Sequence, residues 1–151
     1  MKNLFVLEDR KDLIKRIESL KPTNTKNWGK MTVHQILAHL ADPIRLSLGE
    51  KNAVDINNPV FKSFFGKWMV RFIPWPKAAP TAGEFLPGNG MTEPTDFNSD
   101  KQTLLLLIHR IANVPPDHQF KAHPLFGPLS RKDLGRLYWR HLDHHLRQFS
   151  A

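Results

Sequence analysis

The fold is decided by a stretch near the C-terminus, Leu134-Gly-Arg-Leu-Tyr-Trp-Arg-His-Leu-Asp-His-His-Leu-Arg-Gln-Phe149. At about 100° per residue, one face of a helix here carries Leu134, Leu137, Tyr138, His141, His145 and Gln148. An apolar strip beside it consists of Trp139, Leu142, Leu146 and Phe149. The charged side chains gather on the remaining side, namely Lys132, Arg136, Arg140, Asp143 and Arg147. The pattern predicts a long amphipathic helix whose charged side faces solvent.

Two histidines, His141 and His145, stand four positions apart on the face that this pattern buries. An unpaired buried polar group costs about 1 to 3 kcal/mol, so two imidazoles one turn apart need a shared partner. Side chains four apart on a helix can reach one ion, as helical histidine pairs do in zinc sites. His144 lies at the edge of this face and ranks below the other two. The alternative is that His141 and His145 are core residues hydrogen-bonded to neighbouring helices.

The composition is that of a single domain covering residues 1–151, with 40% hydrophobic residues and no cysteine. The absence of cysteine excludes disulfides, a thiolate nucleophile and a cysteine-based zinc site. A metal would therefore bind to histidine, carboxylate or water. The N-terminus carries too short an apolar run for a signal peptide, and the run 104–108 is too short to span a membrane. These features predict a soluble, cytoplasmic protein.

The chain carries a formal net charge of +8, which would suit an anionic partner. Lysine and arginine are nevertheless scattered over the polar faces of the predicted helices, and no block of five or more basic residues occurs. No aromatic residues interleave with them as in nucleic-acid-binding motifs. The charge alone does not favour direct binding of nucleic acid.

Two helices are predicted in the first third of the chain. The first covers 9–20, with Asp9 as its N-cap. The second begins with a capping box formed by Thr32 and Gln35. Pro43 interrupts its apolar pattern and predicts a kink near His39 or an early end of the helix.

The second helix holds two histidines, His34 and His39, which lie on opposite sides of its apolar stripe. That stripe consists of Val33, Ile36, Leu37, Leu40 and Ile44. Because both histidines are about equally far from the stripe, the periodicity does not choose between them.

The middle of the chain, 49–98, lacks a regular pattern apart from one segment. Asn58 as a cap and Pro59 at the first helical position precede an aromatic stripe within 61–72, which predicts a basic, aromatic helix that covers its own domain. The same stripe is available for a homodimer interface. The segment Pro74 to Gly90 is predicted to be a long loop, and long loops are often functional. It either covers an open position at a metal site and sets substrate choice, or only seals an end of the helical bundle.

Two more helices complete the predicted fold. The third begins at Ser99 with Gln102 as its capping partner, ends at 113–116 and is expected to be the most buried. Ser130 and Asp133 form the capping signal of the last helix. Without any strand signal, the pattern predicts an all-α, four-helix bundle with a long, partly irregular insertion between helices two and three.

Three motifs resemble one known family. They are Trp28-Gly-Lys-Met-Thr-Val-His-Gln-Ile-Leu-Ala-His-Leu-Ala-Asp42, His141-Leu-Asp-His-His-Leu-Arg-Gln148, and the His-Pro-x-Phe-Gly segment His123 to Gly127. The chain is thereby similar to the DinB-like (YfiT-like) superfamily of metalloenzymes, and to a subgroup of bacterial proteins without assigned function. The resemblance implies an up-down-down-up bundle with a divalent ion on three histidines. On this chain these are His39, His141 and His145, so the resemblance favours His39 over His34.

Three histidine ligands leave an open position on zinc or nickel, which is typical of a catalytic site. The resemblance implies chemistry with a small-molecule substrate, because relatives transfer or isomerise groups with low-molecular-weight thiols such as bacillithiol or mycothiol. We therefore expect a divalent-metal-dependent transferase or hydrolase. Gln148 is a candidate for orienting a ligand or bound water, and Asp42 for holding the distal nitrogen of His39.

The alternative function is a non-catalytic, basic helical module that binds an anionic partner, with structural histidines in its core. The remaining histidines are not expected to bind metal. His109 has no partner at helical spacing and is expected to be structural or exposed. The last helix rises about 1.5 Å per residue, so His141 lies about 16 Å along it from the cap Ser130. The loop that holds His123 is therefore not expected to reach the ion, and His123 is expected to shape its loop.

Overall fold

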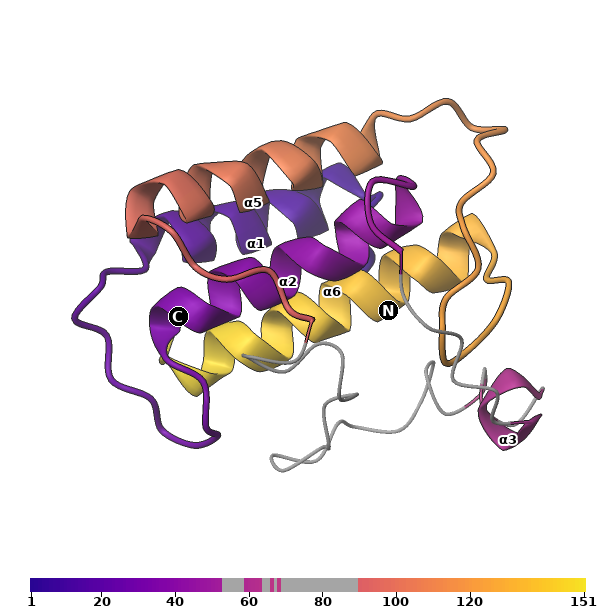
Figure 1. The fold of residues 1–151 in the computed structure, drawn as a ribbon. Helices are drawn as coiled ribbons and strands as arrows, with labels where there is room; N and C mark the ends of the chain where they lie inside the picture. The colour runs from indigo at the N-terminus through magenta and orange to yellow at the C-terminus, as the bar shows by residue number, and fades with distance from the viewer. Residues whose placement is uncertain (53–58, 64–65, 67, 69–89) are drawn as a thin grey trace.

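The computed structural model describes residues 1–52, 59–63, 66, 68 and 90–151. Its helices are α1 (Leu7–Ser19), α2 (Val33–Ser47), α3 (Pro59–Lys62), α5 (Phe97–Ala112) and α6 (Arg131–Gln148). No strand occurs in this part of the chain, whose one isolated β-bridge joins His123 and Gly127. The four long helices lie side by side, and the short α3 lies apart from them (Figure 1). The prediction of an all-helical fold is confirmed for the described residues.

The core is built from all four long helices. The most buried of them is α2, with eleven buried residues among fifteen, whereas α5 has six among sixteen. The prediction that the third long helix would be the most buried is therefore wrong. Although α5 is apolar on most sides, its main helix neighbours among the described residues are α2 and α1, and Leu106 remains 60% exposed. Burial depends on the number of neighbouring helices as well as on hydrophobicity.

Two of the predicted capping arrangements are confirmed. The Thr32 side chain accepts from the backbone N–H of Gln35, and the Gln35 side chain accepts from the N–H of Thr32. The Ser130 hydroxyl accepts from the N–H of Asp133 at the start of α6. Each contact satisfies a backbone amide that has no partner within its helix.

Two predicted helix starts are wrong. Helix α1 begins at Leu7, and its N-cap Val6 makes no side-chain cap. Asp9 instead accepts from the N–H of Asn3 at 2.8 Å. Helix α5 begins two residues before Ser99, because Asp96 caps it by accepting from the N–H of Ser99.

Pro43 was predicted to cause either a kink near His39 or an early end of the helix. Helix α2 continues through Pro43 to Ser47, so the early end is wrong and the kink stays a prediction. A neighbouring helix supports this part of α2. The Tyr138 hydroxyl of α6 donates to the carbonyl of Pro43 at 2.7 Å and accepts from the Ser47 hydroxyl at 2.5 Å. These buried contacts stabilise the turn that lacks the amide of Pro43.

Half of the predicted aromatic helix lies outside the described residues. Its first residue, Pro59, is also the first residue of α3, but α3 spans four residues. The predicted cap Asn58 and the loop Pro74 to Gly90, apart from Gly90 itself, also lie outside the described residues. That the aromatic helix covers the domain, and that the loop Pro74 to Gly90 covers the metal site, stay predictions.

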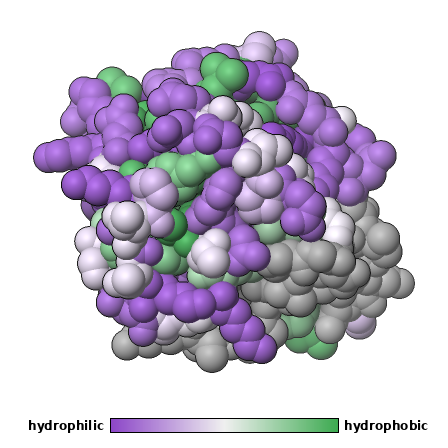
Figure 2. Space-filling view, turned by 60° about the vertical axis from the view of Figure 1, so that its left-hand side comes forward, coloured by the Kyte–Doolittle hydropathy of each residue, from purple (hydrophilic) through white to green (hydrophobic). Residues whose placement is uncertain are grey.

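The described surface is largely hydrophilic on the face in Figure 2, where hydrophobic residues form a smaller area. No helix in the described ranges is both long and apolar enough to cross a membrane. On the charged side of α6, Lys132 and Arg147 are exposed. Asp143 is half-buried, because it pairs with Arg16 of α1 at 2.7 Å. The prediction of a wholly solvent-facing side therefore holds only in part.

Candidate metal centre

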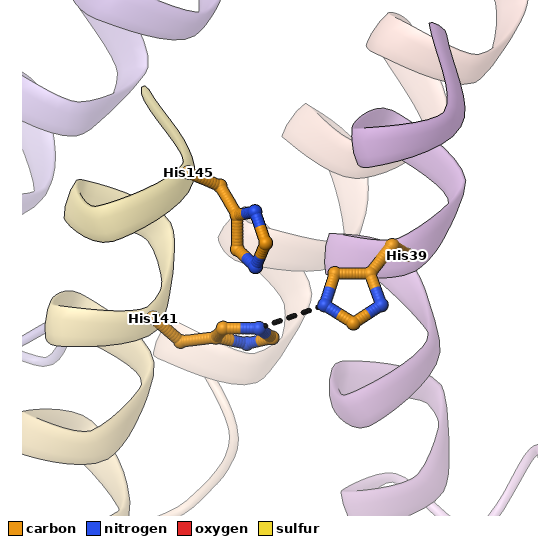
Figure 3. A group of neighbouring side chains, drawn as sticks. All are labelled: His39, His141 and His145. Carbon is orange, nitrogen blue, oxygen red and sulfur yellow. Dashed lines mark hydrogen bonds between the residues drawn. The ribbon is translucent and has the colours of Figure 1, made fainter. Parts of the chain in front are cut away.

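Three histidines from two helices converge between α2 and α6. His39 projects from α2, and His141 and His145 project from successive turns of α6 (Figure 3). One ligand atom from each lies within 4.8 Å of those of the other two. The Nε2 atoms of His39 and His141 are 3.0 Å apart. The structure thus brings together the three histidines that the resemblance implied.

The surroundings of His141 and His145 disfavour the protonated form of the imidazole. His39 is 3% exposed and His145 is 7% exposed, while His141 is half-buried. Burial, followed by the nearby imidazoles of His145 and His39, holds the pKa of His141 well below its usual value. Burial, together with His39, lowers the pKa of His145 to about 3. Both rings are therefore neutral at pH 7, which is the form that binds metal.

Gln148 determines which nitrogen of His145 faces the group. Its Oε1 atom lies 2.8 Å from Nδ1 of His145, and both side chains are buried. Because an amide oxygen only accepts, Nδ1 carries the proton and Nε2 keeps its lone pair. Hydrogen bonds of this kind orient histidine ligands in metal sites. The structure therefore supports an orienting role for Gln148, acting on His145.

Sequence reasoning assigned no role to Gly29, although it belongs to the Trp-Gly pair of the first motif. Its φ angle is +86°, which glycine adopts readily. A Cβ atom at this position would lie 2.7 Å from Nε2 of Gln148. Asn27, two residues before Gly29, donates its backbone N–H to the carbonyl of Gln148 at 2.7 Å. The loop before α2 thus packs on the residue that orients His145.

Asp42 does not hold His39. Its fully buried carboxylate accepts from Lys51 Nζ at 2.6 Å, from the Thr92 N–H at 2.9 Å and from the Thr92 hydroxyl at 2.6 Å. Arg45 approaches it at 3.4 Å. Burial alone would raise the pKa of Asp42, but these hydrogen bonds outweigh it and hold the pKa below its usual value. Among the described residues, Asp42 connects α2 to the segment at Thr92 instead.

The other histidines of the described chain lie outside this group. Nε2 of His34 lies 2.8 Å from a carboxylate oxygen of Asp100, and His34 does not belong to the group that contains His39. His144 is half-buried, and its ring contacts those of Trp28 and His145. His109 is exposed, as expected.

His123 shapes its own loop, as predicted. Its Nδ1 atom accepts from the backbone N–H groups of Leu125 and Phe126, at 3.1 and 3.3 Å. The backbone of His123 also exchanges two hydrogen bonds with Gly127. It is not a member of the three-histidine group. Burial lowers the pKa of His123 from 6.5 to about 4.

Replacing His123 with asparagine should reduce the acid sensitivity of the fold. Between pH 6.5 and about 4 the unfolded chain binds a proton at His123 that the folded chain does not, so stability falls as the pH falls through this window. The loss amounts to at most about 3 kcal/mol at roughly 1.4 kcal/mol per pH unit. Asparagine keeps an acceptor for the two amides but does not titrate.

The measurement is urea unfolding of the metal-free wild-type protein and of His123→Asn at pH 7 and pH 4.5. The variant should lose less free energy of unfolding than the wild type between these values. Titration of the other histidines occurs in both proteins, so most of its contribution cancels in the difference. Equal losses would contradict the assignment.

An all-helical fold with three buried or half-buried histidines on two facing helices defines a helical protein with a candidate metal centre. The family model described as "Protein of unknown function (DUF1569)" matches residues 2–151, so the chain belongs to this family. No match is found among curated proteins or among solved structures. The function is therefore inferred from the site itself.

Proposed function

We propose that this protein is an enzyme dependent on a divalent metal ion held by His39, His141 and His145. The observation that carries the proposal is the convergence of their three ligand atoms within 4.8 Å. The resemblance to the DinB-like superfamily, with its up-down-down-up bundle, supports the same proposal independently of these distances. Zinc or nickel is the preferred ion, because imidazole nitrogen suits both.

The residues fit such an ion in number and in chemistry. Catalytic zinc sites commonly use three protein ligands and leave one position open, whereas structural sites use four. Here three imidazoles form the group, and no carboxylate of the described chain joins it. The neutral state of His141 and His145 makes their lone pairs available at pH 7.

When bound, the ion would supply Lewis acidity toward a water molecule or thiol at the open position. The chain itself contributes the orientation of its ligands, since Gln148 keeps Nε2 of His145 directed at the group. It contributes no thiol, because it contains no cysteine. We therefore propose a small-molecule substrate, with a low-molecular-weight thiol as substrate or co-substrate in a transfer or hydrolysis reaction.

The alternative is a non-catalytic basic module in which the histidines only fill a polar core. The 3.0 Å contact between His39 and His141 is compatible with this alternative, because one neutral ring can donate to the other. The convergence of three imidazoles on one point favours an ion instead, because imidazole is a common metal ligand. Metal analysis separates the two.

The proposal is tested on protein purified without a histidine tag and without added metal. Elemental analysis should find about one zinc or nickel ion per chain, as three ligands at one site require. Chelation should then lower the melting temperature. At a free ion concentration of a hundred times Kd the ion adds about 2.7 kcal/mol, equivalent to roughly 5 to 10 °C for a chain of this size.

Two results would contradict the proposal. One is metal-free protein that still takes up neither zinc nor nickel in a direct titration. The other is an unchanged melting curve after complete removal of metal from loaded protein. Activity with a panel of thiol substrates is the next measurement once a loaded state is established.

A further inference from the structure

A cavity of about 420 Å³ lies between the C-terminal end of α2, helix α3 and the loop that precedes α6. Its volume falls within the usual range of small-molecule sites, roughly 300 to 1,000 Å³. The described residues that line it are Leu46, Lys51, Asn52, Lys62, Lys121, Ala122, His123, Pro124, Gly127 and Pro128. None of them belongs to the three-histidine group.

The lining is basic. It includes three lysines and, among its described residues, no carboxylate. Lys51 is held in place by the buried Asp42 at 2.6 Å and by the carbonyl of Gly90 at 2.8 Å, so Asp42 offsets one of the three charges. The ammonium group of Lys121 bonds to the neutral amide oxygen of Asn52 at 3.3 Å, a contact that leaves its charge in place. Ammonium groups around a cavity attract anionic oxygen atoms.

The lining is also partly apolar, with Leu46, Ala122, Pro124 and Pro128 beside the lysines. His123 adds a hydrogen-bond donor to this wall. Its Nδ1 atom accepts from two backbone amides, so the neutral ring carries its proton on Nε2. Apolar surface combined with a few charged and polar groups is typical of a site for a small organic molecule.

We propose that this cavity binds a small organic anion through carboxylate or phosphate oxygens that contact its lysines. Binding of an anion in this cavity requires no metal ion, so this part of the proposal goes beyond the proposed function. If the cavity is also the substrate pocket of the proposed enzyme, that role rests on the proposed function.

The test uses the full-length, metal-free protein, so that no probe can bind through an ion. Succinate, inorganic phosphate and the uncharged succinamide are titrated separately and followed by backbone amide shifts. Succinate or phosphate should bind saturably and shift the amides of the 121–128 segment, and succinamide should not. The comparison of succinate with phosphate identifies which anionic group the cavity prefers.

Variants locate the binding. Lys62→Gln and Lys121→Gln should each weaken binding roughly tenfold, as expected for the loss of one charge-assisted hydrogen bond. The control is Lys15→Gln, which removes the same charge from an exposed position on α1 that does not line the cavity. Its affinity should equal that of the wild type.

If succinamide bound as tightly as succinate, the proposal would be overturned, because binding would not depend on the anionic charge. If Lys15→Gln lost as much affinity as the cavity variants, it would also be overturned, because binding would then depend on the overall charge of the protein. Absence of saturable binding by both anions would overturn it as well. Failure of the metal proposal has a different signature, since zinc uptake by the wild type is measured separately. A chain without a metal site can pass this test, and a chain with one can fail it.

Discussion

Replacing His141 with alanine is expected to reduce the metal content of untagged protein to background, and His39→Ala and His145→Ala should do the same. Each change leaves two imidazoles where three converge within 4.8 Å. Loss of a supporting partner alone costs about 10- to 100-fold in affinity, so loss of a ligand should exceed 100-fold. Zinc titration of the purified variants measures the effect.

His109→Ala and His118→Ala are the matched controls, because neither residue belongs to the group. Both should keep wild-type zinc affinity. Gln148→Leu should give an intermediate loss of about 10- to 100-fold, because it removes the partner of His145 Nδ1 and leaves the three ligands in place. If His144 proved indispensable and His141 dispensable, the assignment of the ligand face of α6 would be wrong.

Replacing Asp42 with alanine is expected to destabilise the fold by about 3 kcal/mol, at the lower end of the 3 to 5 kcal/mol typical of a broken buried ion pair. The carboxylate is fully buried, and its loss removes hydrogen bonds from Lys51 and Thr92. The Lys51 side chain is 21% exposed, so its ammonium group regains some contact with water, which limits the effect. Urea unfolding of the metal-free protein measures the change.

Zinc affinity distinguishes this structural role from a role at the metal. Asp42→Ala should retain wild-type affinity under conditions where it is folded, because the hydrogen bonds of Asp42 in the described structure go to Lys51, Thr92 and Arg45 and to none of the three histidines. Thr92→Val is a milder control that removes one hydroxyl donor to the same carboxylate and should cost about 1 kcal/mol. If Asp42→Ala had wild-type stability and no zinc binding, Asp42 would instead be a hydrogen-bond partner of the metal ligand His39.

Local sequence determined much of this fold. The capping residues Thr32 and Ser130 were predictable, because each contacts an amide three residues further along the same chain. The pairing of His141 with His145 on one face of α6 was predictable for the same reason, since helical geometry alone places residues four apart together. The start of α1 was missed because its N-cap Val6 makes no side-chain hydrogen bond, and the start of α5 was missed because Asp96 caps it three residues before Ser99.

Only the tertiary structure decided which groups from distant segments meet. Periodicity could not separate His39 from His34, and the separation came from packing: His34 bonds to Asp100 of α5, while His39 faces α6. Asp42 lies one turn from His39 in sequence, yet it bonds to Lys51 and Thr92.

The fit of Gly29 against Gln148 depends likewise on a loop meeting a helix more than a hundred residues away. Helical spacing determines which residues share a face. The partner of that face depends on how the helices and loops pack, and a buried polar group bonds to whichever partner the packing brings near.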